Sequence, residues 1–239
     1  WMPGPMPTSE PAPTSICPYR REMRLITPIG MTNPVRFIIG TLPEVREVEP
    51  NDRLPDTSLG DQLPAVINGR IMPGDVDRFS FKARKGMSLV AAAQARDLIP
   101  YLADAVPGWF QAVLTLYDAN GREVAYADDF QFQPDPVLHV VIPADGVYTL
   151  VIRDALYRGR EDFVYRITVG EVPFITGMFP LGIRKGKRVA ARVMGWNLPS
   201  STVMFDGAGE GFGTTCVEAH GARSNEVTYR IDDLPEITE

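Results

Sequence analysis

The chain has 239 residues, enough for one large domain or two smaller ones at roughly 100–200 residues per domain. Hydrophobic residues make up 44% and charged residues 23%, which is the composition of a globular protein and excludes a wholly disordered chain. The formal net charge of −6 argues against a surface for nucleic acid, and no apolar run approaches the roughly 18 residues needed for membrane insertion.

The local pattern predicts strands almost throughout, because short alternating or continuously apolar runs are bounded by Gly, Pro, Asp or Asn. In chain order we expect strands at 66–71, 78–81, 112–117, 137–142, 148–152, 163–169, 188–193 and 227–231. A helix is conceivable only at 97–105, where Pro100 interrupts it. Many short strands at this spacing predict an all-β fold, either a sandwich or a barrel.

An internal repeat indicates how the chain is divided. Residues 32–47 (TNPVRFIIGTLPEVRE) and 224–239 (SNEVTYRIDDLPEITE) align without a gap and share seven of sixteen residues. We therefore expect the end of a small sandwich at 1–43, a central domain at 44–170, a second small sandwich at 171–235, and the start of another repeat at 236–239. The alternative is one protein with two similar strand-and-exit segments. A start at Trp1, without a signal peptide, favours a piece excised from a longer polypeptide.

Two acidic stretches carry most of the chemistry that the sequence offers. The first is 47–52 (EVEPND) and the second is 73–77 (PGDVD). If the fold brings them together, carboxylate repulsion is severe unless a cation neutralises it, and Ca²⁺ takes six to eight oxygen ligands in flexible geometry. Taken alone, the same residues are also ordinary turn chemistry on an exposed link.

A family resemblance adds to this pattern. The order of EVEPND at 47–52, GDVDRFSF at 74–81, AVLTLYD at 112–118, Gly121, the Asp pair 128–129, PADGVY at 143–148 and YRITV at 165–169 resembles the bacterial pre-peptidase C-terminal domain. That family is related to the collagen-binding domains of clostridial collagenases. The resemblance implies a calcium site at the lead-in to the sandwich, with six candidate ligands: Glu47, Glu49, Asn51, Asp52, Asp75 and Asp77. The second Asp pair is spaced more tightly than in those relatives, which leaves the role of Asp75 open.

Residues 172–199 resemble the start of an IPT/TIG-type immunoglobulin-like domain. The match consists of Pro173, Ile175, Pro180, Gly182, Gly186, Val189 and the run GWNLP at 195–199. By the internal repeat, residues 1–43 are then the closing strands of a domain of the same kind. Together the two resemblances imply a jelly-roll-like β-sandwich at 44–170, flanked by immunoglobulin-like segments at 1–43 and 171–235.

Aromatic residues concentrate in three loop-like places and form a candidate ligand-binding set. Tyr, Trp and Arg are common anchors of recognition surfaces. The set comprises Tyr101, Trp109, Phe110, Phe130, Phe132, Tyr157 and Arg158. The alternative is that these rings cap the sandwich core.

The sequence offers little support for an enzyme, and we expect no catalytic residues. His139 lies within a predicted strand and His220 in a Gly-flanked loop, and the chain lacks a GxSxG elbow. Cys17 and Cys216 have no zinc-ligand spacing, and they fit two thiols, one disulfide or bridges to other chains.

We therefore expect a non-catalytic structural or adhesive segment of a larger exported repeat protein, stiffened by calcium. It would be secreted, periplasmic or on the cell surface, with an extracellular protein, a polysaccharide or other subunits of a surface assembly as partners. The alternative is a targeting appendage of a secreted hydrolase that binds collagen, another protein or a polysaccharide.

Overall fold

The computed structural model describes residues 19–53, 57–99 and 108–234, and within these ranges the protein is all-β, as predicted, with no helix. Each stretch expected to be extended overlaps an observed strand. Of the residues 97–105, for which a helix was conceivable, 97–99 form a turn and a bend. Residues 100–105 lie outside the described residues.

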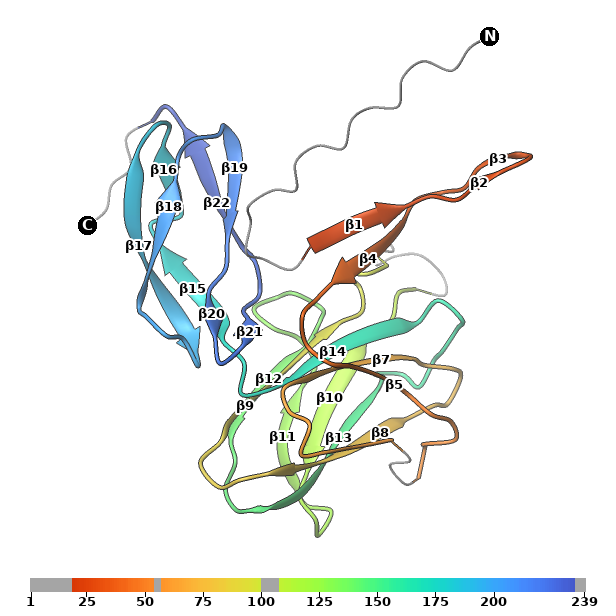
Figure 1. Cartoon of the computed structure of the whole chain (residues 1–239). Helices are drawn as coiled ribbons and strands as arrows, with labels where there is room; N and C mark the ends of the chain where they lie inside the picture. Colours follow the sequence, from red (N-terminus) through yellow and green to blue (C-terminus); the bar gives the residue numbers. More distant parts are fainter. Residues whose placement is uncertain (1–18, 54–56, 100–107, 235–239) are drawn as a thin grey trace.

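Two five-stranded sheets form a sandwich from residues 44–170 (Figure 1). One sheet has the order β11 (Glu123–Ala127), β10 (Ala112–Tyr117), β13 (Gly146–Asp154), β8 (Asp77–Ala83) and β6 (Thr57–Gly60). The other has the order β12 (Val137–Val141), β9 (Ser88–Gln94), β14 (Val164–Gly170), β7 (Ala65–Arg70) and β5 (Glu44–Arg46). Neighbouring strands are antiparallel, except that the edge strands β5 and β6 run parallel to β7 and β8.

The sandwich core follows from the period-two pattern of its strands. In β8, Asp77, Phe79, Phe81 and Ala83 are buried and alternate with more exposed residues, because successive side chains of a strand point to opposite faces. Residues of both sheets meet in one apolar cluster, and burying each large side chain contributes about 1.5–3 kcal/mol. Asp77 is therefore placed on the inward face of a strand whose other inward residues are apolar.

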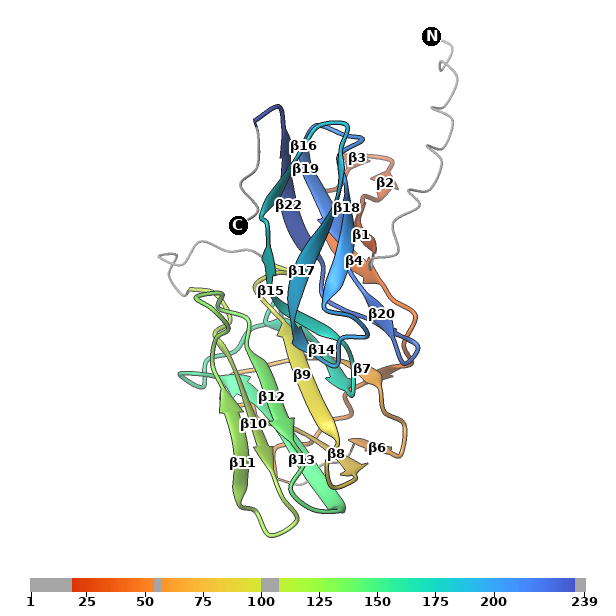
Figure 2. The same ribbon diagram turned by 90° about the vertical axis from the view of Figure 1, so that its left-hand side faces the viewer.

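Residues 174–232 form a smaller pair of three-stranded sheets, which stands at one end of the sandwich (Figure 2). One sheet has the order β15 (Phe174–Phe179), β17 (Arg188–Trp196) and β18 (Thr202–Asp206), and the other β16 (Gly182–Arg184), β22 (Val227–Asp232) and β19 (Gly211–Thr215). A short ladder joins β20 (Glu218–Ala219) to β21 (Ala222–Arg223). The two three-stranded sheets share a core of Ile183, Ala191, Phe205, Tyr229 and Ile231.

The first described residues form a long hairpin that extends away from the sandwich (Figure 1). Its strands are β1 (Tyr19–Met23), β2 (Ile26–Thr27), β3 (Gly30–Met31) and β4 (Val35–Ile39), with β1 paired to β4 and β2 to β3. The division into domains at 43, 170 and 235 remains a prediction, and residues 236–239 lie outside the described part of the chain.

An aromatic joint connects the smaller pair of sheets to the sandwich. The Trp196 ring stacks on the His139 ring with centroids 4.4 Å apart, and Phe130 and Phe174 pack against the same indole. The Asn197 amide donates to the backbone oxygens of Ser88 and Val172, both at 2.9 Å. His139 is thus a structural residue of this joint, and burial lowers its pKa.

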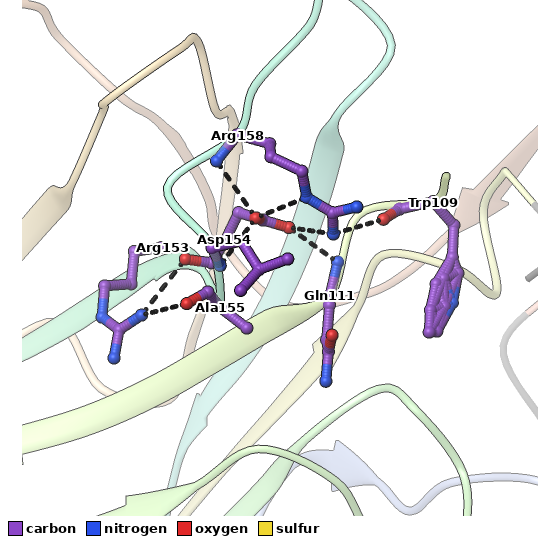
Figure 3. A network of polar contacts seen from close by, with 7 residues as sticks. Trp109, Gln111, Arg153, Asp154, Ala155 and Arg158 are labelled. Atoms are coloured by element: carbon purple, nitrogen blue, oxygen red, sulfur yellow. Dashed lines mark hydrogen bonds and ion pairs between the residues drawn. The ribbon is translucent and has the colours of Figure 1, made fainter. Parts of the chain in front are cut away.

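A buried carboxylate fixes the turn that follows β13 (Figure 3). Asp154 is fully buried, and it accepts hydrogen bonds from the Arg158 guanidinium at 2.9 and 3.0 Å and from the backbone amides of Gln111, Leu156 and Arg158. Arg158 also donates to the Trp109 oxygen at 3.1 Å. Burial alone would raise the pKa of Asp154, but these donors outweigh it and lower the pKa.

We predict that Asp154→Asn destabilises the protein by about 3 kcal/mol at pH 7, because it leaves the Arg158 guanidinium without its buried counter-ion. Since the folded-state pKa lies below the unfolded value, the stability from this carboxylate is complete above about pH 5 and is lost as the pH falls through the folded-state pKa. Urea unfolding at pH 7 and pH 3 should therefore show a large difference that shrinks in acid. Asp118→Asn is the control, since Asp118 is a half-buried turn residue whose oxygen accepts backbone amides and pairs with no guanidinium in the hydrogen bonds of this turn. Equal effects of the two substitutions would contradict the prediction.

Candidate functional site

The lead-in segment, residues 44–52, runs along the edge of the β7 sheet before the chain enters the sandwich. Strand β5 pairs in parallel with β7, and the Glu47 amide continues this ladder by donating to the Asn68 oxygen at 3.0 Å. Arg166 on β14 forms an ion pair with Glu44 at 2.8 Å, and its side chain is almost fully buried. The hydrogen bond and charge of Arg166 lower the pKa of Glu44 against the opposing effect of burial. This segment is therefore held in one position against the sheet.

Three of the six predicted ligands meet where this segment passes the start of β8. Glu47, Glu49 and Asp77 each place a carboxylate oxygen within 4.8 Å of the others. Glu49 is exposed, Glu47 is half-buried and Asp77 is fully buried, so the cluster runs from solvent into the sandwich. The two acidic stretches of the sequence do converge here.

A tyrosine hydroxyl lies between two of these carboxylates. Tyr165 on β14 is paired with Asp77 Oδ2 and lies 3.0 Å from Glu47 Oε2. A phenol carries one proton and can donate to only one carboxylate at a time. The two carboxylates are therefore stable beside each other only if one of them takes up a further proton or if both share a cation.

Gly69 makes this close approach possible. A Cβ at this position on β7 would lie 2.1 Å from Glu47 Oε2 and 2.2 Å from the Tyr165 hydroxyl. The backbone amide of Arg70 then donates to both Glu47 oxygens, at 2.9 and 3.0 Å. The absence of a side chain lets Glu47 and Tyr165 meet over the strand.

Two polar groups at this site are buried without a hydrogen-bond partner among the described residues. They are the Asp77 Oδ1 oxygen and both polar atoms of the Asn51 amide, and both residues are completely buried. The Asn51 backbone amide donates to Glu49 Oε2 at 2.9 Å, which places Asn51 beside the cluster. Buried polar atoms are normally satisfied, so the oxygens of Asn51 and Asp77 indicate a missing donor or cation, whereas Asn51 Nδ2 requires an acceptor.

Asp52 and Asp75 form the rim of the site rather than its centre. Asp75 accepts the backbone amides of Met72 and Val76, both at 3.0 Å, and Asp52 accepts the Val76 amide at 3.2 Å. With Glu49 they line an open depression that also includes Pro73 and Gly74. These two residues are close enough to add negative charge, but their oxygens are largely engaged in holding the turn.

The electrostatics agree with an excess of negative charge. Burial, followed by the neighbouring Glu47 and Asp75 charges, raises the pKa of Asp77 to about 9, against the opposing Tyr165 hydrogen bond. Burial and the Asp75 charge also raise the pKa of Glu49, and burial together with Asp52 raises that of Asp75. In the metal-free protein the side chain of Asp77 is therefore protonated and neutral at pH 7.

The donor set suits a hard divalent cation. Glu47, Glu49, Asn51 and Asp77 offer carboxylate and amide oxygens only, without nitrogen or sulfur ligands, which is the chemistry that Ca²⁺ selects. The orphaned oxygens of Asn51 and Asp77 are the observation on which this fit rests.

Sequence reasoning missed Tyr165 and Gly69. Tyr165 occupies an inward position of an alternating strand, where a tyrosine usually signals only core packing, and its hydroxyl reaches the site across 118 residues of sequence. Gly69 sits within a strand pattern, and an isolated glycine there does indicate a close approach of other groups. Gly69 was therefore the one of these two residues from which the sequence could have indicated a close approach at this strand.

The predicted aromatic set is dispersed. Phe110 is buried against Phe163 in the core, Phe130 belongs to the joint at Trp196, and Arg158 is occupied by Asp154. The Trp109 ring lies under the Arg96 guanidinium. Tyr101 lies outside the described residues.

Phe132 and Tyr157 are the exposed members of that set, and both have a positive φ, of 65° and 55°. Phe132 is fully exposed at the tip of a two-residue turn closed by reciprocal hydrogen bonds between Phe130 and Gln133. Ligand binding by this set remains a prediction.

Comparison with known proteins gives partial matches. The chain is 37% identical over 108 residues to a probable subtilase-type serine protease of Deinococcus radiodurans, an alignment that covers 44% of this chain and 14% of the protease. The match thus spans about a seventh of that protein's length. No protein-family model matches the chain.

Two solved structures show a likeness at low identity. One is the pre-peptidase C-terminal domain of a Bacillus anthracis collagenase, with 14% identity, a TM-score of 0.35, and coverage of 50% of this chain and 99% of that domain. The other is a periplasmic inhibitor of g-type lysozyme from Salmonella Typhimurium, with 18% identity, a TM-score of 0.30, and coverage of 54% and 98%. Among the described residues, no helix is long and apolar enough to cross a membrane.

We predict that metal-free protein loses stability as the pH rises from about 4 towards 9. The folded-state pKa of Asp77 lies above its unfolded value, so the folded state binds the extra proton and the stabilisation is lost through this range. Urea unfolding in EDTA at pH 5 and pH 8.5 should show this decline, and Asp77→Asn should flatten it. Asp129→Asn, at an exposed position, is the control. If wild type and Asp77→Asn have parallel pH profiles, Asp77 is not protonated in the folded protein.

Proposed function

We propose that this chain is a non-catalytic segment of an exported protein, whose sandwich binds Ca²⁺ through Glu47, Glu49, Asn51 and Asp77. The observation that carries the proposal is the pair of fully buried, unpartnered polar groups of Asn51 and Asp77 beside two further carboxylates. Calcium supplies the positive charge that these oxygens lack. Asp52 and Asp75 at the rim raise the local negative potential that attracts it.

The consequence of binding is mechanical. Glu47, Glu49 and Asn51 belong to the lead-in segment, whereas Asp77 begins β8 in the opposite sheet, so a shared ion ties the segment to both sheets. Binding also requires Asp77 to release its proton, because the ion and the proton compete for the same carboxylate. The chain that precedes residue 44 would then leave the sandwich in a fixed direction.

The assignment to an exported, protease-associated protein is supported by the similarity to the Deinococcus subtilase-type protease and by the resemblance of residues 44–170 to pre-peptidase C-terminal domains. The resemblance of 172–199 to IPT/TIG domains is a further part of this proposal. Activity of a longer protein would lie in other segments, and this chain would act as an appendage to them.

We predict that Ca²⁺ raises the melting temperature of the full chain. At a concentration of 100 Kd the linkage free energy is about 2.7 kcal/mol, which corresponds to a rise of about 5–10 °C for a chain of this size. Asp77→Asn and Glu49→Gln should remove most of the rise. Calorimetric titration at pH 7.5 in two buffers of different ionisation enthalpy should show proton release on binding to wild type.

The matched control is Asp61→Asn, since Asp61 is an exposed carboxylate on the same sandwich outside the cluster. It should bind and respond as wild type does. Mg²⁺ should stabilise less, because it demands near-octahedral geometry and loses its water reluctantly. A melting temperature that is the same in Ca²⁺ and EDTA would refute the calcium part of the proposal and leave the appendage role standing.

One observation favours a second candidate function, the binding of an extracellular protein or polysaccharide. Gln131 and Phe132 both have positive φ, which non-glycine residues adopt at a cost of about 1–3 kcal/mol. A turn of this kind favours Asn-Gly, yet it carries a fully exposed aromatic ring. A strained position that retains an exposed phenyl group is suited to contact with another molecule.

We predict that Phe132→Gly stabilises the protein by about 1 kcal/mol, because glycine adopts the positive φ without strain. The same substitution should weaken retention on an insoluble polymer, because it removes the exposed ring. Urea unfolding and sedimentation with insoluble collagen, cellulose and chitin would measure the two effects. Phe132→Ala keeps the strain and is the control for loss of the ring alone. If wild type is retained on none of these polymers, this second candidate fails.

A further inference from the structure

The N-terminal hairpin repeats the last hairpin of the chain strand by strand. The β1–β4 ladder begins with Tyr19 opposite Ile39, and the β19–β22 ladder begins with Gly211 opposite Ile231, an offset of 192 residues on both strands. The short ladders β2–β3 and β20–β21 follow at the same offset. The two hairpins therefore have one register.

Their side-chain hydrogen bonds are also the same. Thr32 donates its amide to the Leu25 oxygen at 2.9 Å, and its hydroxyl accepts the Leu25 amide at 2.9 Å. Ser224 makes both contacts with Val217, at 2.9 and 3.0 Å. The equivalence thus reaches individual atoms, and residues of the two hairpins can be compared one by one.

The hairpins differ in what covers them. In the C-terminal hairpin, the β15–β17–β18 sheet packs over the apolar face, and Phe205 stacks on Tyr229 with ring centroids 4.0 Å apart. In the N-terminal hairpin the same positions are apolar but open. The exposed fractions of the three aligned pairs are 58% and 8% for Leu25 and Val217, 40% and 6% for Phe37 and Tyr229, and 48% and 3% for Ile39 and Ile231.

The outer edge of β4 is open as well. Its counterpart in β22 pairs in parallel with β16, from Gly182 opposite Arg230 to Arg184 opposite Asp232. By the shared register, a strand equivalent to β16 would pair with residues 38–40. Ile38, Ile39 and Gly40 instead line a cavity of about 1170 Å³, whose other walls include residues of β9, β15 and β22, and no described strand pairs with β4 on this side.

An asparagine marks the attachment point in both hairpins. The Asn225 side chain accepts the Ile175 amide at 2.7 Å and donates to the Ile175 oxygen at 2.9 Å, so it clamps the backbone of β15. The equivalent residue, Asn33, is exposed, and no described residue hydrogen-bonds to its side-chain amide. Its donor and acceptor are available for a backbone of the same kind.

We propose that the open face of the N-terminal hairpin binds the segment of a preceding repeat that is equivalent to residues 171–206. That segment would supply a β16-like strand to the edge of β4, an aromatic ring to stack on Phe37, and a β15-like backbone to Asn33. The β15–β17–β18 sheet of a second copy is unsuitable, because its own β19–β22 hairpin already covers it. The face is thus a socket for one half of a small sandwich, and this role is independent of calcium.

The test adds the missing half to the full chain. Residues 171–206 are fused in front of Trp1. The 192-residue offset places residues 1–14 at the positions of 193–206, but these residues contain five prolines and have Pro13 in the place of Phe205, which does not suit a β18-like strand. Residues 1–18 are therefore retained as the connection, since lengthening a loop costs only about 0.6 kcal/mol per doubling. Hydrogen exchange of the β4 amides should slow about 100-fold relative to the unfused chain, because outward amides become paired. Binding of an apolar fluorescent dye should fall. The matched control carries Ile183→Asp in the added copy only, and it should exchange as the unfused chain does.

Equal β4 exchange in the fusion and its control would overturn the proposal, provided that β14 exchange shows an intact sandwich. A full chain that sediments as a dimer, with β4 protected until dilution, would also overturn it by assigning the face to a second copy.

A second pair of variants tests the comparison without the fusion. Ile39→Asp should leave the melting temperature of the full chain nearly unchanged, whereas Ile231→Asp should lower it strongly, since only Ile231 is buried. In the fused chain, Ile39→Asp should restore fast β4 exchange. If Ile39→Asp destabilises the unfused chain as much as Ile231→Asp does, the face is already in use and the proposal is wrong.

Discussion

Two carboxylates share one phenolic proton, and this constraint organises the part of the sandwich along which the lead-in segment runs. Tyr165 reaches both Glu47 and Asp77, and Gly69 removes the side chain that would separate them. Like charges so close in a buried place cannot persist unaided. The site must therefore take up either a proton or a cation, and this choice links its occupancy to the position of the lead-in segment.

The opposite end of the sandwich is fixed by different physics. There, the rings of His139, Phe130 and Phe174 surround Trp196, and the Asn197 amide satisfies two backbone oxygens. This joint consists of apolar burial and neutral hydrogen bonds, so it depends little on ions, and it responds to pH only in acid, where His139 takes up a proton that burial opposes. At neutral and alkaline pH, one end of the sandwich thus responds to protons and cations, while the other does not.

The all-β fold and the strand positions were predictable, because alternation and turn residues act locally and the buried faces agree with them. Convergence of the two acidic stretches was also predictable, but only from a resemblance in the order of motifs. Tyr165 was not, since its role depends on a long-range approach across β7 that no local pattern encodes. The dispersal of the aromatic set has a similar cause: a loop-like context does not reveal whether a ring such as Phe110 turns inward to the core.

Only residues 171–173 separate β14 from β15, and the Asn197 side chain grips the middle one of the three. A connection this short and doubly anchored has no hinge, so any tilt of the smaller pair of sheets would have to break the indole stack. Arranged in series, units joined in this way would advance by a constant pitch and rotation. They would form a stiff spacer, whose reach is set by the number of units rather than by thermal bending.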